Sequence, residues 1–225
     1  MIPSRYIAPR LGGLSARLAL RVRTRIFDDV MAALSPVPGW RVLDVGVTSD
    51  RSADSNFFEA LYPYKNQLTA VGLEDASFLE DLFPGVRFVR ADGRRLPFAD
   101  LSFDLTFCSA VIEHVGAHSE QERLLRELLR VSRRCVVTTP NRWFPVEFHT
   151  LTPLLHWLPQ RWFRQLLRWR GERFFCEEAN LNLLDERDLK RLIAGASFGH
   201  DIKVSFRNQR LLGLESNLVA YLERH

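Results

Sequence analysis

The sequence of 225 residues lacks the features that mark several classes of protein. No apolar run approaches the roughly 20 residues that a bilayer-spanning helix needs, so we expect no membrane-spanning segment. Residues 1–25 carry scattered arginines and no uninterrupted apolar core, so we expect no secretory signal there. The three cysteines, Cys108, Cys135 and Cys176, are an odd number without metal-like spacing. They favour a reducing, cytoplasmic location.

The chain is only mildly basic. Its formal net charge is +4 and its pI is about 9.2. A basic surface can bind nucleic acid or anionic lipid, but at this level it more often serves solubility. We therefore do not expect a nucleic-acid partner on the grounds of charge.

Short apolar runs alternate with helical patterns along most of the chain, which predicts parallel βαβ units. The predicted fold is a doubly wound, seven-stranded, mostly parallel α/β sheet, with the last strand antiparallel to the one before it. We expect one domain over residues 1–225, with an N-terminal helix at about 15–35 and a helical insertion at about 143–180 after strand five. The predicted strands are 41–46, 67–73, 86–90, 101–109, 135–139, 202–206 and 217–223.

The insertion differs from the rest of the chain in composition. Arginines and tryptophans alternate along residues 154–170 at helical spacing. This pattern suits a peripheral contact with a membrane surface, and it equally suits a lid over an apolar substrate. It also suits a helix that packs on the domain with its arginines in solvent.

Acidic and small residues stand where the predicted strands end, which is where ligands bind in a doubly wound sheet. An acid after strand two can accept two hydrogen bonds from a ribose diol, and an acid after strand three can accept one from an adenine amino group. Other interpretations remain open: Asp44 can cap its loop, Glu74 and Asp75 can be solvated, and Asp92-Gly93 is a common turn pair. The candidates are Asp44, Gly46, Glu74, Asp75, Asp92, Gly93, Ser109 and Ala110.

Several of these residues lie in motifs that resemble the class I S-adenosylmethionine-dependent methyltransferases, in particular the small-molecule subgroup that includes the ubiquinone-biosynthesis enzymes. The motifs are Val42-Leu43-Asp44-Val45-Gly46, Val71-Gly72-Leu73-Glu74, Ala91-Asp92-Gly93, Ser102-Phe103-Asp104-Leu105 and Val111-Ile112-Glu113-His114-Val115. The similarity covers about residues 40–142, with a weaker echo at 182–198.

The resemblance implies a Rossmann-like sheet and S-adenosyl-L-methionine as cofactor. It places Gly46 under the methionine part of the cofactor, Glu74 at the ribose hydroxyls and Asp92 at the adenine amino group. It also places Ser109 and Ala110 along the methionine side. Asp44 would hold the loop, or a water near the cofactor's amino group.

The loop after strand one departs from the family pattern. Thr48 and Asp50 stand where the family usually carries glycines, and the loop runs longer before a helix that begins near Asn56. The sequence Asn56-Phe57-Phe58-Glu59 is typical of a capping box. Side chains at 48 and 50 either push the loop back from the cofactor or turn towards it. Such a change leaves three outcomes open: weak binding, an altered pose or lost activity.

Glu113 and His114 are the candidate catalytic residues. A neutral histidine near the transferred methyl group can act as general base for a hydroxyl acceptor, although a structural role for His114 is slightly favoured over this one. His118 and Glu113 suggest a metal site, but the ligand set looks incomplete, so we expect no metal. After strand five, Asn141, Arg142 and His149 are candidate substrate contacts.

These patterns together predict a methyltransferase acting on a small, amphipathic or lipid-linked acceptor, with oxygen as the first choice of acceptor atom. We expect it in the cytoplasm or peripherally at the inner membrane surface. Two alternatives remain: a non-catalytic binding module of the same fold with a degenerate cofactor loop, and an RNA methyltransferase that uses the arginine-rich insertion to hold phosphates.

Overall fold

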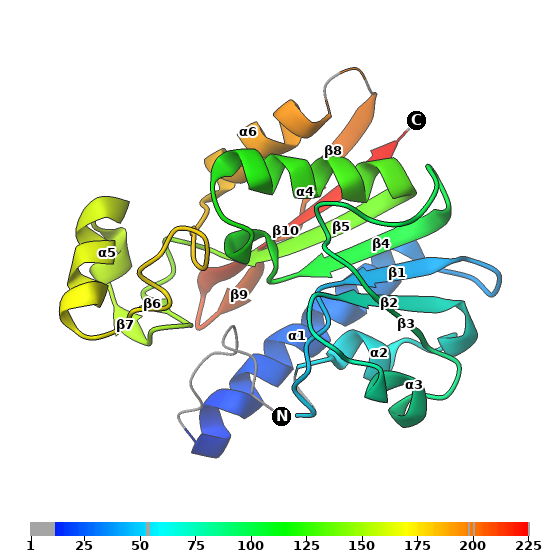
Figure 1. The fold of residues 1–225 in the computed structure, drawn as a ribbon, viewed down its shortest axis with the longest axis horizontal. Helices are drawn as coiled ribbons and strands as arrows, with labels where there is room; N and C mark the ends of the chain where they lie inside the picture. The colour runs from blue at the N-terminus through cyan, green and yellow to red at the C-terminus, as the bar shows by residue number, and fades with distance from the viewer. Residues whose placement is uncertain (1–11, 53–54, 198, 200, 225) are drawn as a thin grey trace.

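A mixed β-sheet forms the centre of the molecule in a computed structural model that describes residues 12–52, 55–197, 199 and 201–224 (Figure 1). The strands lie in the order β3-β2-β1-β4-β5-β10-β8, with β9 paired to β10. The first five are parallel, and β10 runs antiparallel to both β5 and β8. Their bounds are β1 Val42–Val45, β2 Leu68–Gly72, β3 Arg87–Arg90, β4 Phe103–Ser109, β5 Ser132–Pro140, β8 Ile202–Phe206, β9 Gln209–Leu211 and β10 Leu214–Arg224.

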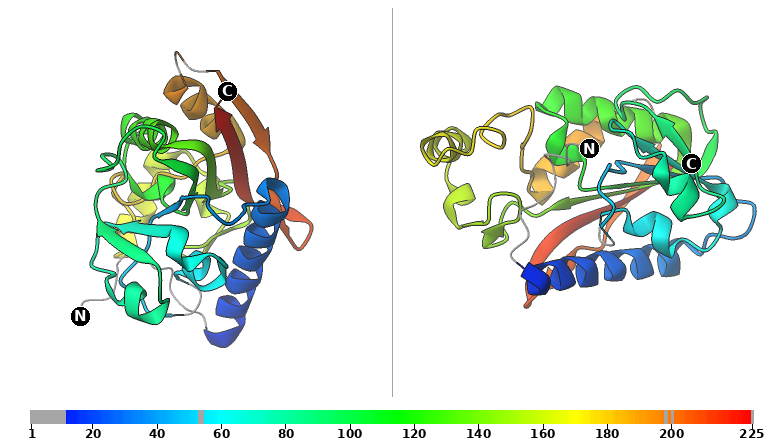
Figure 2. Two further views of the ribbon diagram at one scale, coloured as in Figure 1. Left: turned by 90° about the vertical axis from the view of Figure 1, so that its right-hand side faces the viewer. Right: turned by 60° about the horizontal axis from the view of Figure 1, so that its bottom comes forward.

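Helices cover both faces of this sheet (Figure 2). Helices α1 (Gly12–Leu34), α2 (Phe57–Leu61) and α3 (Phe78–Leu82) lie on one face, where they share an apolar core with β1, β2 and β4. Helices α4 (His118–Val131) and α6 (Glu186–Ala196) lie on the other face and share a second core with β4, β5 and β10. The alternation of side chains along each strand supplies both cores at once.

The segment between β5 and α6 is an insertion that lies beyond the end of β5 (Figure 1). It contains a two-stranded ladder of β6 (Val146–Glu147) and β7 (Thr152–Pro153), a 3-10 turn at Leu155–Trp157 and helix α5 (Gln160–Trp169). Phe163 and Leu167 of α5 form a small separate core with residues 175–183. The ladder is a finding that the composition of this segment did not indicate.

The predicted fold class is confirmed. The strands occur where the apolar runs placed them, and the last strand is antiparallel to its neighbours. The added strand is β9, a short piece on the edge of β10. Helix α6 begins with a capping box in which the side chain of Asp185 accepts from the N–H of Asp188.

Among the described residues, no helix is both long enough and apolar enough to cross a membrane.

Candidate functional site

The loop after β1 begins at Gly46, whose backbone has a φ of +120°, which only glycine adopts easily. A Cβ atom at this position would lie 2.1 Å from Cγ2 of Val111. The N–H groups of Gly46 and Val47 both donate to the carbonyl oxygen of Val71 on β2. Gly46 therefore brings three strand ends together: the loop after β1 touches β2 and the segment that follows β4.

The side chains that replace the family's glycines turn into their own loop. The carboxylate of Asp50 accepts hydrogen bonds from Ser52 and Ser55, and the hydroxyl of Thr48 accepts from the N–H of Asp50 at 3.3 Å. The backbone N–H of Thr48 donates to Oδ1 of Asn56 at 3.0 Å. The side-chain amide of Asn56 donates back to the carbonyl oxygens of Thr48 and Asp50. Hydrogen bonds from side chains therefore fix the conformation of this loop, which in the family usually contains glycines at positions 48 and 50.

The predicted capping box at the start of α2 is wrong. Asn56 precedes the helix but makes no capping hydrogen bond from its side chain, because that side chain closes the preceding loop instead. Glu59, the expected partner in the box, is fully buried beside Asp44.

Asp44 and Glu59 form a buried pair of acids beneath this loop. Asp44 is 7% exposed on β1, and Glu59 is fully buried on α2. Burial raises the pKa of both carboxyl groups, and the charge of Glu59 raises the pKa of Asp44 further. Neither Glu59 oxygen accepts a hydrogen bond from a donor elsewhere in the described chain. We infer that the pair holds a proton between its two carboxyl groups at neutral pH.

Glu74 and Asp75 follow β2 but have different surroundings. Glu74 is half-buried, and its Oε2 accepts from the hydroxyl of Ser49 at 2.6 Å. This contact fixes the carboxylate at the mouth of the β1 loop. Asp75 is exposed and accepts from the N–H of Ser77, and this hydrogen bond lowers the pKa of Asp75. Such a contact is typical of an aspartate that stabilises a turn.

Asp92 and Gly93 follow β3. Both oxygens of Asp92 accept from Arg94, whose guanidinium also pairs with Glu120 at the start of α4. The hydrogen bond from Arg94 is the main cause that lowers the pKa of Asp92. A Cβ atom on Gly93 would lie 2.9 Å from Leu124 and 3.0 Å from Val45. Gly93 therefore allows close packing of this turn against β1 and α4.

Ser109 and Ala110 end β4. The hydroxyl groups of Ser109 and Thr138 lie 2.8 Å apart, and the N–H of Ala110 donates to the Thr138 carbonyl. Ala110 has a φ of +55°, an uncommon conformation for a residue with a Cβ, and it turns the chain towards the 3-10 turn Ile112–His114.

That turn brings Glu113 and His114 against His149 from the insertion. We call Glu113, His114 and His149 the histidine cluster. Nε2 of His114 lies 3.0 Å from Nε2 of His149, and the three potential ligand atoms of the cluster all lie within 4.8 Å of one another. The cluster is the set among the described residues that has the donors to hold a metal ion.

Each group in the histidine cluster has a second partner that orients it. Nδ1 of His114 lies 2.7 Å from the carbonyl oxygen of Asn180, and Nδ1 of His149 lies 2.7 Å from Oε1 of Glu147. Oε2 of Glu113 accepts from the hydroxyl of Thr139 at 3.0 Å. These contacts come from four segments distant in sequence: the turn after β4, β5, the β6–β7 ladder and the segment before α6.

Burial and these contacts shift the pKa of every group. Burial raises the pKa of Glu113 to about 7, and burial with the neighbouring His149 lowers the pKa of His114 to about 3. Burial would also raise the pKa of Glu147, but hydrogen bonds from His149 and Thr150 hold it at about 2. Burial would lower the pKa of His149, but the Glu147 carboxylate raises it. His114 is therefore neutral, and Glu147 is charged, at physiological pH.

Sequence reasoning missed the residues that hold the turn in place. Gln121 of α4 donates to the carbonyl oxygens of Ile112 and Asn182, and the N–H of Asn182 donates to the carbonyl oxygen of Glu113. Glu147 was also missed, although a Glu-x-His pair soon after a strand end is a signal that could have found it. His118 is exposed at the start of α4 and does not join the cluster.

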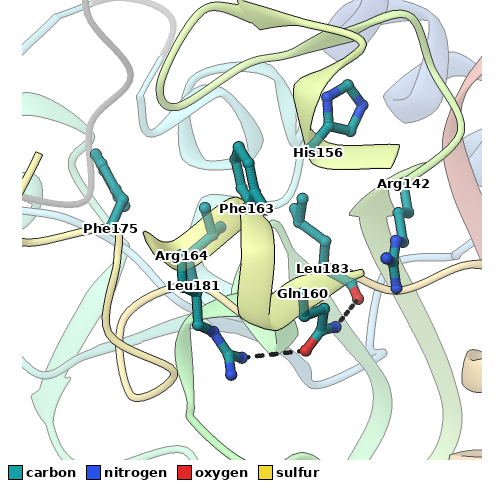
Figure 3. A pocket seen from close by; sticks show the side chains of 8 residues that line it. All are labelled: Arg142, His156, Gln160, Phe163, Arg164, Phe175, Leu181 and Leu183. Carbon is teal, nitrogen blue, oxygen red and sulfur yellow. Dashed lines mark hydrogen bonds between the residues drawn. The ribbon is translucent and has the colours of Figure 1, made fainter. Parts of the chain in front are cut away.

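The two other candidate substrate residues are engaged by the protein itself. The side chain of Asn141 accepts from the N–H of Trp143 and donates to the carbonyl oxygen of Glu215. Arg142 donates to the carbonyl oxygen of Leu158 and lies over the ring of Trp143. Figure 3 shows Arg142 lining a small pocket with residues of α5 and with Phe175, whose ring also lies 5.4 Å from that of His149.

The sequence is similar to those of known methyltransferases. Residues 43–135 match a family of proteins described as a methyltransferase domain. The chain is 32% identical over 131 residues to a demethylmenaquinone methyltransferase of Renibacterium salmoninarum, covering 56% of this chain and 51% of that protein. It is 39% identical over 113 residues to an uncharacterized methyltransferase of Mycobacterium sp. (strain KMS), covering 48% of this chain and 41% of that protein. The chain thus matches about half the length of these relatives, or less.

A solved structure extends the likeness to nearly the whole chain. The magnesium protoporphyrin IX methyltransferase of Synechocystis PCC 6803, determined with bound S-adenosylhomocysteine, has a TM-score of 0.56 and 14% sequence identity. The match covers 98% of this chain and 91% of that one. At this identity the likeness concerns the fold.

Proposed function

We propose that this chain is a class I S-adenosylmethionine-dependent methyltransferase that transfers a methyl group from S-adenosylmethionine to an oxygen of a small, amphipathic acceptor; its similarity to a methyltransferase domain and to methyltransferase relatives supports this proposal. The observation that carries the proposal is the position of the histidine cluster. Val111, which packs on Gly46 of the cofactor loop, is followed within one turn by Glu113 and His114. The predicted cofactor loop and the histidine cluster are therefore neighbours.

The residues present fit the cofactor. The carboxylate of Glu74, held by Ser49, has lone pairs left for a ribose diol. Asp92 is kept ionised by Arg94 and can accept from an amino group. Ser109 and Ala110 lie where β4 turns towards Val111. When bound, S-adenosylmethionine supplies an electrophilic methyl group on a positively charged sulfur.

The histidine cluster would receive the acceptor hydroxyl. The transfer would break the O–H bond of the acceptor and form a bond between its oxygen and the methyl carbon, and S-adenosylhomocysteine would leave with the electron pair of the carbon–sulfur bond on its sulfur. The polar groups of the cluster would accept the released proton. The fold would contribute to such a displacement by proximity and orientation more than by acid–base catalysis.

The surface of the insertion supports an amphipathic or lipid-linked acceptor. On α5, Trp162 and Trp169 are 54% and 84% exposed and stand two turns apart, so they share one face. Arg161 and Arg168, each one residue earlier, are exposed beside that face, while Phe163 and Leu167 are buried on the opposite side. Exposed tryptophans flanked by arginines suit the headgroup region of an anionic membrane.

Cofactor binding is the first test. We expect isothermal titration calorimetry to detect binding of S-adenosylhomocysteine, and we expect Glu74→Gln to weaken it about tenfold or more because a ribose contact to a charged acceptor is lost. Asp75→Asn is the matched control, since the carboxylate of this neighbouring acid accepts a hydrogen bond within its own turn and should not contact the cofactor. Absence of heat with the wild-type protein would favour the non-catalytic alternative.

Acceptor class is the second test. With a methyl-labelled cofactor, we expect transfer to hydroxylated aromatic compounds that carry an aliphatic tail. We also expect co-sedimentation with vesicles containing phosphatidylglycerol, reduced in the double variant Trp162→Ala/Trp169→Ala without a change in Tm. Binding to RNA that weakens steeply with salt, together with methyl transfer to that RNA, would instead support the RNA methyltransferase alternative.

A further inference from the structure

The histidine cluster contains a contact between two imidazole rings that requires a positive charge. A carbonyl oxygen only accepts hydrogen bonds, so the 2.7 Å contact of Nδ1 of His114 with the Asn180 carbonyl places a proton on that nitrogen. Oε1 of Glu147 also accepts from the backbone N–H of His149, and Oε2 accepts from Thr150, so the carboxylate acts as an acceptor and places a proton on Nδ1 of His149 as well. In the neutral rings both Nε2 atoms then carry lone pairs, and these atoms face each other at 3.0 Å. Two lone pairs at this distance repel unless a cation lies between or beside them.

A proton on one ring would satisfy this contact but not the rest of the cluster. That proton would form a hydrogen bond between the two Nε2 atoms and would not reach Glu113. Glu113 is fully buried, and its Oε1 has no hydrogen-bond partner among the described residues. A buried carboxylate oxygen left without a partner is costly. A metal ion would serve both nitrogens and the carboxylate together.

We propose that Glu113, His114 and His149 bind one divalent first-row transition metal ion through two imidazole nitrogens and one carboxylate oxygen. The inference deepens the proposed function, since the ion would lie where the acceptor oxygen is to be activated. It replaces the expectation of no metal. The ligand that the sequence does not reveal is His149, for which the sequence predicts a contact with the substrate.

The geometry suits such an ion. Two nitrogens in adjacent positions of one octahedral ion, each about 2.1 Å from it, stand about 3.0 Å apart. Mg²⁺ and Ca²⁺ prefer oxygen ligands, whereas two imidazoles with one carboxylate suit Mn²⁺, Fe²⁺, Co²⁺ or Zn²⁺. Three protein ligands leave coordination positions open, as in catalytic rather than structural sites. An acceptor hydroxyl on an open position would have its pKa lowered by the ion.

The hydrogen-bond partners of the Nδ1 atoms of His114 and His149 are of the kind found at metal sites. Histidine ligands almost always donate their other N–H to a carboxylate or a backbone carbonyl, and here Glu147 and Asn180 supply one of each. Four further hydrogen bonds fix Glu147 and Glu113: the N–H of His149 and both donors of Thr150 bind Glu147, and Thr139 binds Glu113. The rings are therefore held in place before any ion arrives. Phe175 packs against both rings.

The test uses Co²⁺ as probe on the full chain after treatment with EDTA. We expect one equivalent of Co²⁺ to bind and to give visible d–d absorption bands, with Zn²⁺ displacing it. Glu113→Gln and His149→Ala should each weaken binding about 100-fold or more, and Glu147→Gln about 10- to 100-fold, because it removes the carboxylate that orients His149. His118→Ala, which changes an exposed histidine four residues after His114, should leave binding unchanged.

Circular dichroism and the binding of S-adenosylhomocysteine report whether each variant is folded. If a variant does not fold, the stoichiometry of Co²⁺ binding to the wild-type protein decides whether the metal site exists. Absence of a stoichiometric Co²⁺ site, or one that survives Glu113→Gln in a folded protein, would overturn the proposal. Binding of S-adenosylhomocysteine without Co²⁺ would overturn the metal site alone. Binding of Co²⁺ without S-adenosylhomocysteine would support the metal site and overturn the proposed methyl transfer.

Discussion

At the scale of single residues, the acids Asp44 and Glu59 tie stability to pH. Their pKa values are raised by burial, so the unfolded chain loses its protons at lower pH than the folded protein does. Stability is therefore lost as pH rises above about 4, where the unfolded acids ionise, and it is regained as pH falls. This is the opposite of the usual behaviour of a paired surface acid.

We predict that Glu59→Gln stabilises the protein by about 1 kcal/mol at pH 7, because the amide removes one ionisable group and can donate to Asp44. The gain should shrink as pH falls towards about 4, and urea denaturation at both pH values measures it. Glu172→Gln, a change at an exposed acid, should have little effect at either pH. Destabilisation by Glu59→Gln at pH 7 would show that the pair does not share a proton.

Gly46 offers a second prediction at this scale, and Gly39 provides a matched control. Both have a strongly positive φ, but a Cβ on Gly39 would meet nothing within 4 Å, whereas one on Gly46 would meet Val111. We expect Gly39→Ala to cost about 1–3 kcal/mol from backbone strain alone. Gly46→Ala should cost about 1–3 kcal/mol more from overpacking.

Urea denaturation of the two single variants and of Gly46→Ala/Val111→Ala measures this difference. The second substitution removes the methyl group that the new Cβ would strike, so it should recover part of the loss. Equal costs for Gly39→Ala and Gly46→Ala would show that the approach of the β1 loop to Val111 is unimportant.

At the scale of elements, Arg130 joins α4 to the loop before β4. Its guanidinium pairs with Glu127 and Asp100 and donates to the carbonyl oxygens of Leu96 and Phe98. The same carboxylate of Glu127 accepts from the N–H of Leu96. The loop over residues 96–101 is therefore attached to the helix by one side chain and its partner.

We predict that Arg130→Met destabilises the protein by about 2–3 kcal/mol, because several partly buried acceptors lose a charged donor. Arg126→Met is the control on the same helix, where the exposed pair with Glu122 contributes less than about 1 kcal/mol. Thermal unfolding of the two variants compares them. A loss for Arg130→Met no larger than that for Arg126→Met would mean that the loop is held by its apolar contacts.

The elements themselves could be predicted from the sequence, whereas the contacts between distant elements could not. Buried strands such as β1 and β4 appear as short apolar runs, and Asp185 shows the start of α6 through its capping box. Asn56 fits a capping box equally well, but the shape of the loop gives its side chain another partner. His149 meets His114 from 35 residues away only because Glu147 and Asn180 orient the two rings. Sequence spacing contains no signal for such a meeting.

At the scale of the whole molecule, β10 joins the two layers. Leu218, Ala220 and Leu222 enter the core under α4 and α6, while Val219 and Tyr221 enter the core under α1 and α2. One strand thus contributes alternate side chains to both sides of the sheet. The two cores are expected to unfold together for this reason.

We predict that Leu218→Ala, at a fully buried position, destabilises the protein by about 2–5 kcal/mol while unfolding remains a single transition. Val204→Ala on the outer strand β8, where the side chain is 40% exposed, should cost less than about 1 kcal/mol. Denaturation followed by circular dichroism and by tryptophan fluorescence tests both statements. Transitions that separate in Leu218→Ala would show that the layers are independent.

The position of β10 between β5 and β8 also affects when these strands can pair during synthesis of the chain. Strand β8 leaves the ribosome before β10, yet its sheet partner is β10. Until residues 214–224 have been made, β8 has no strand to pair with, and the edge of β5 stays open with its N–H and C=O groups unpaired. A nascent chain paused before this point would offer that edge to any neighbouring chain, so the interval before β10 emerges is when aggregation competes most strongly with folding.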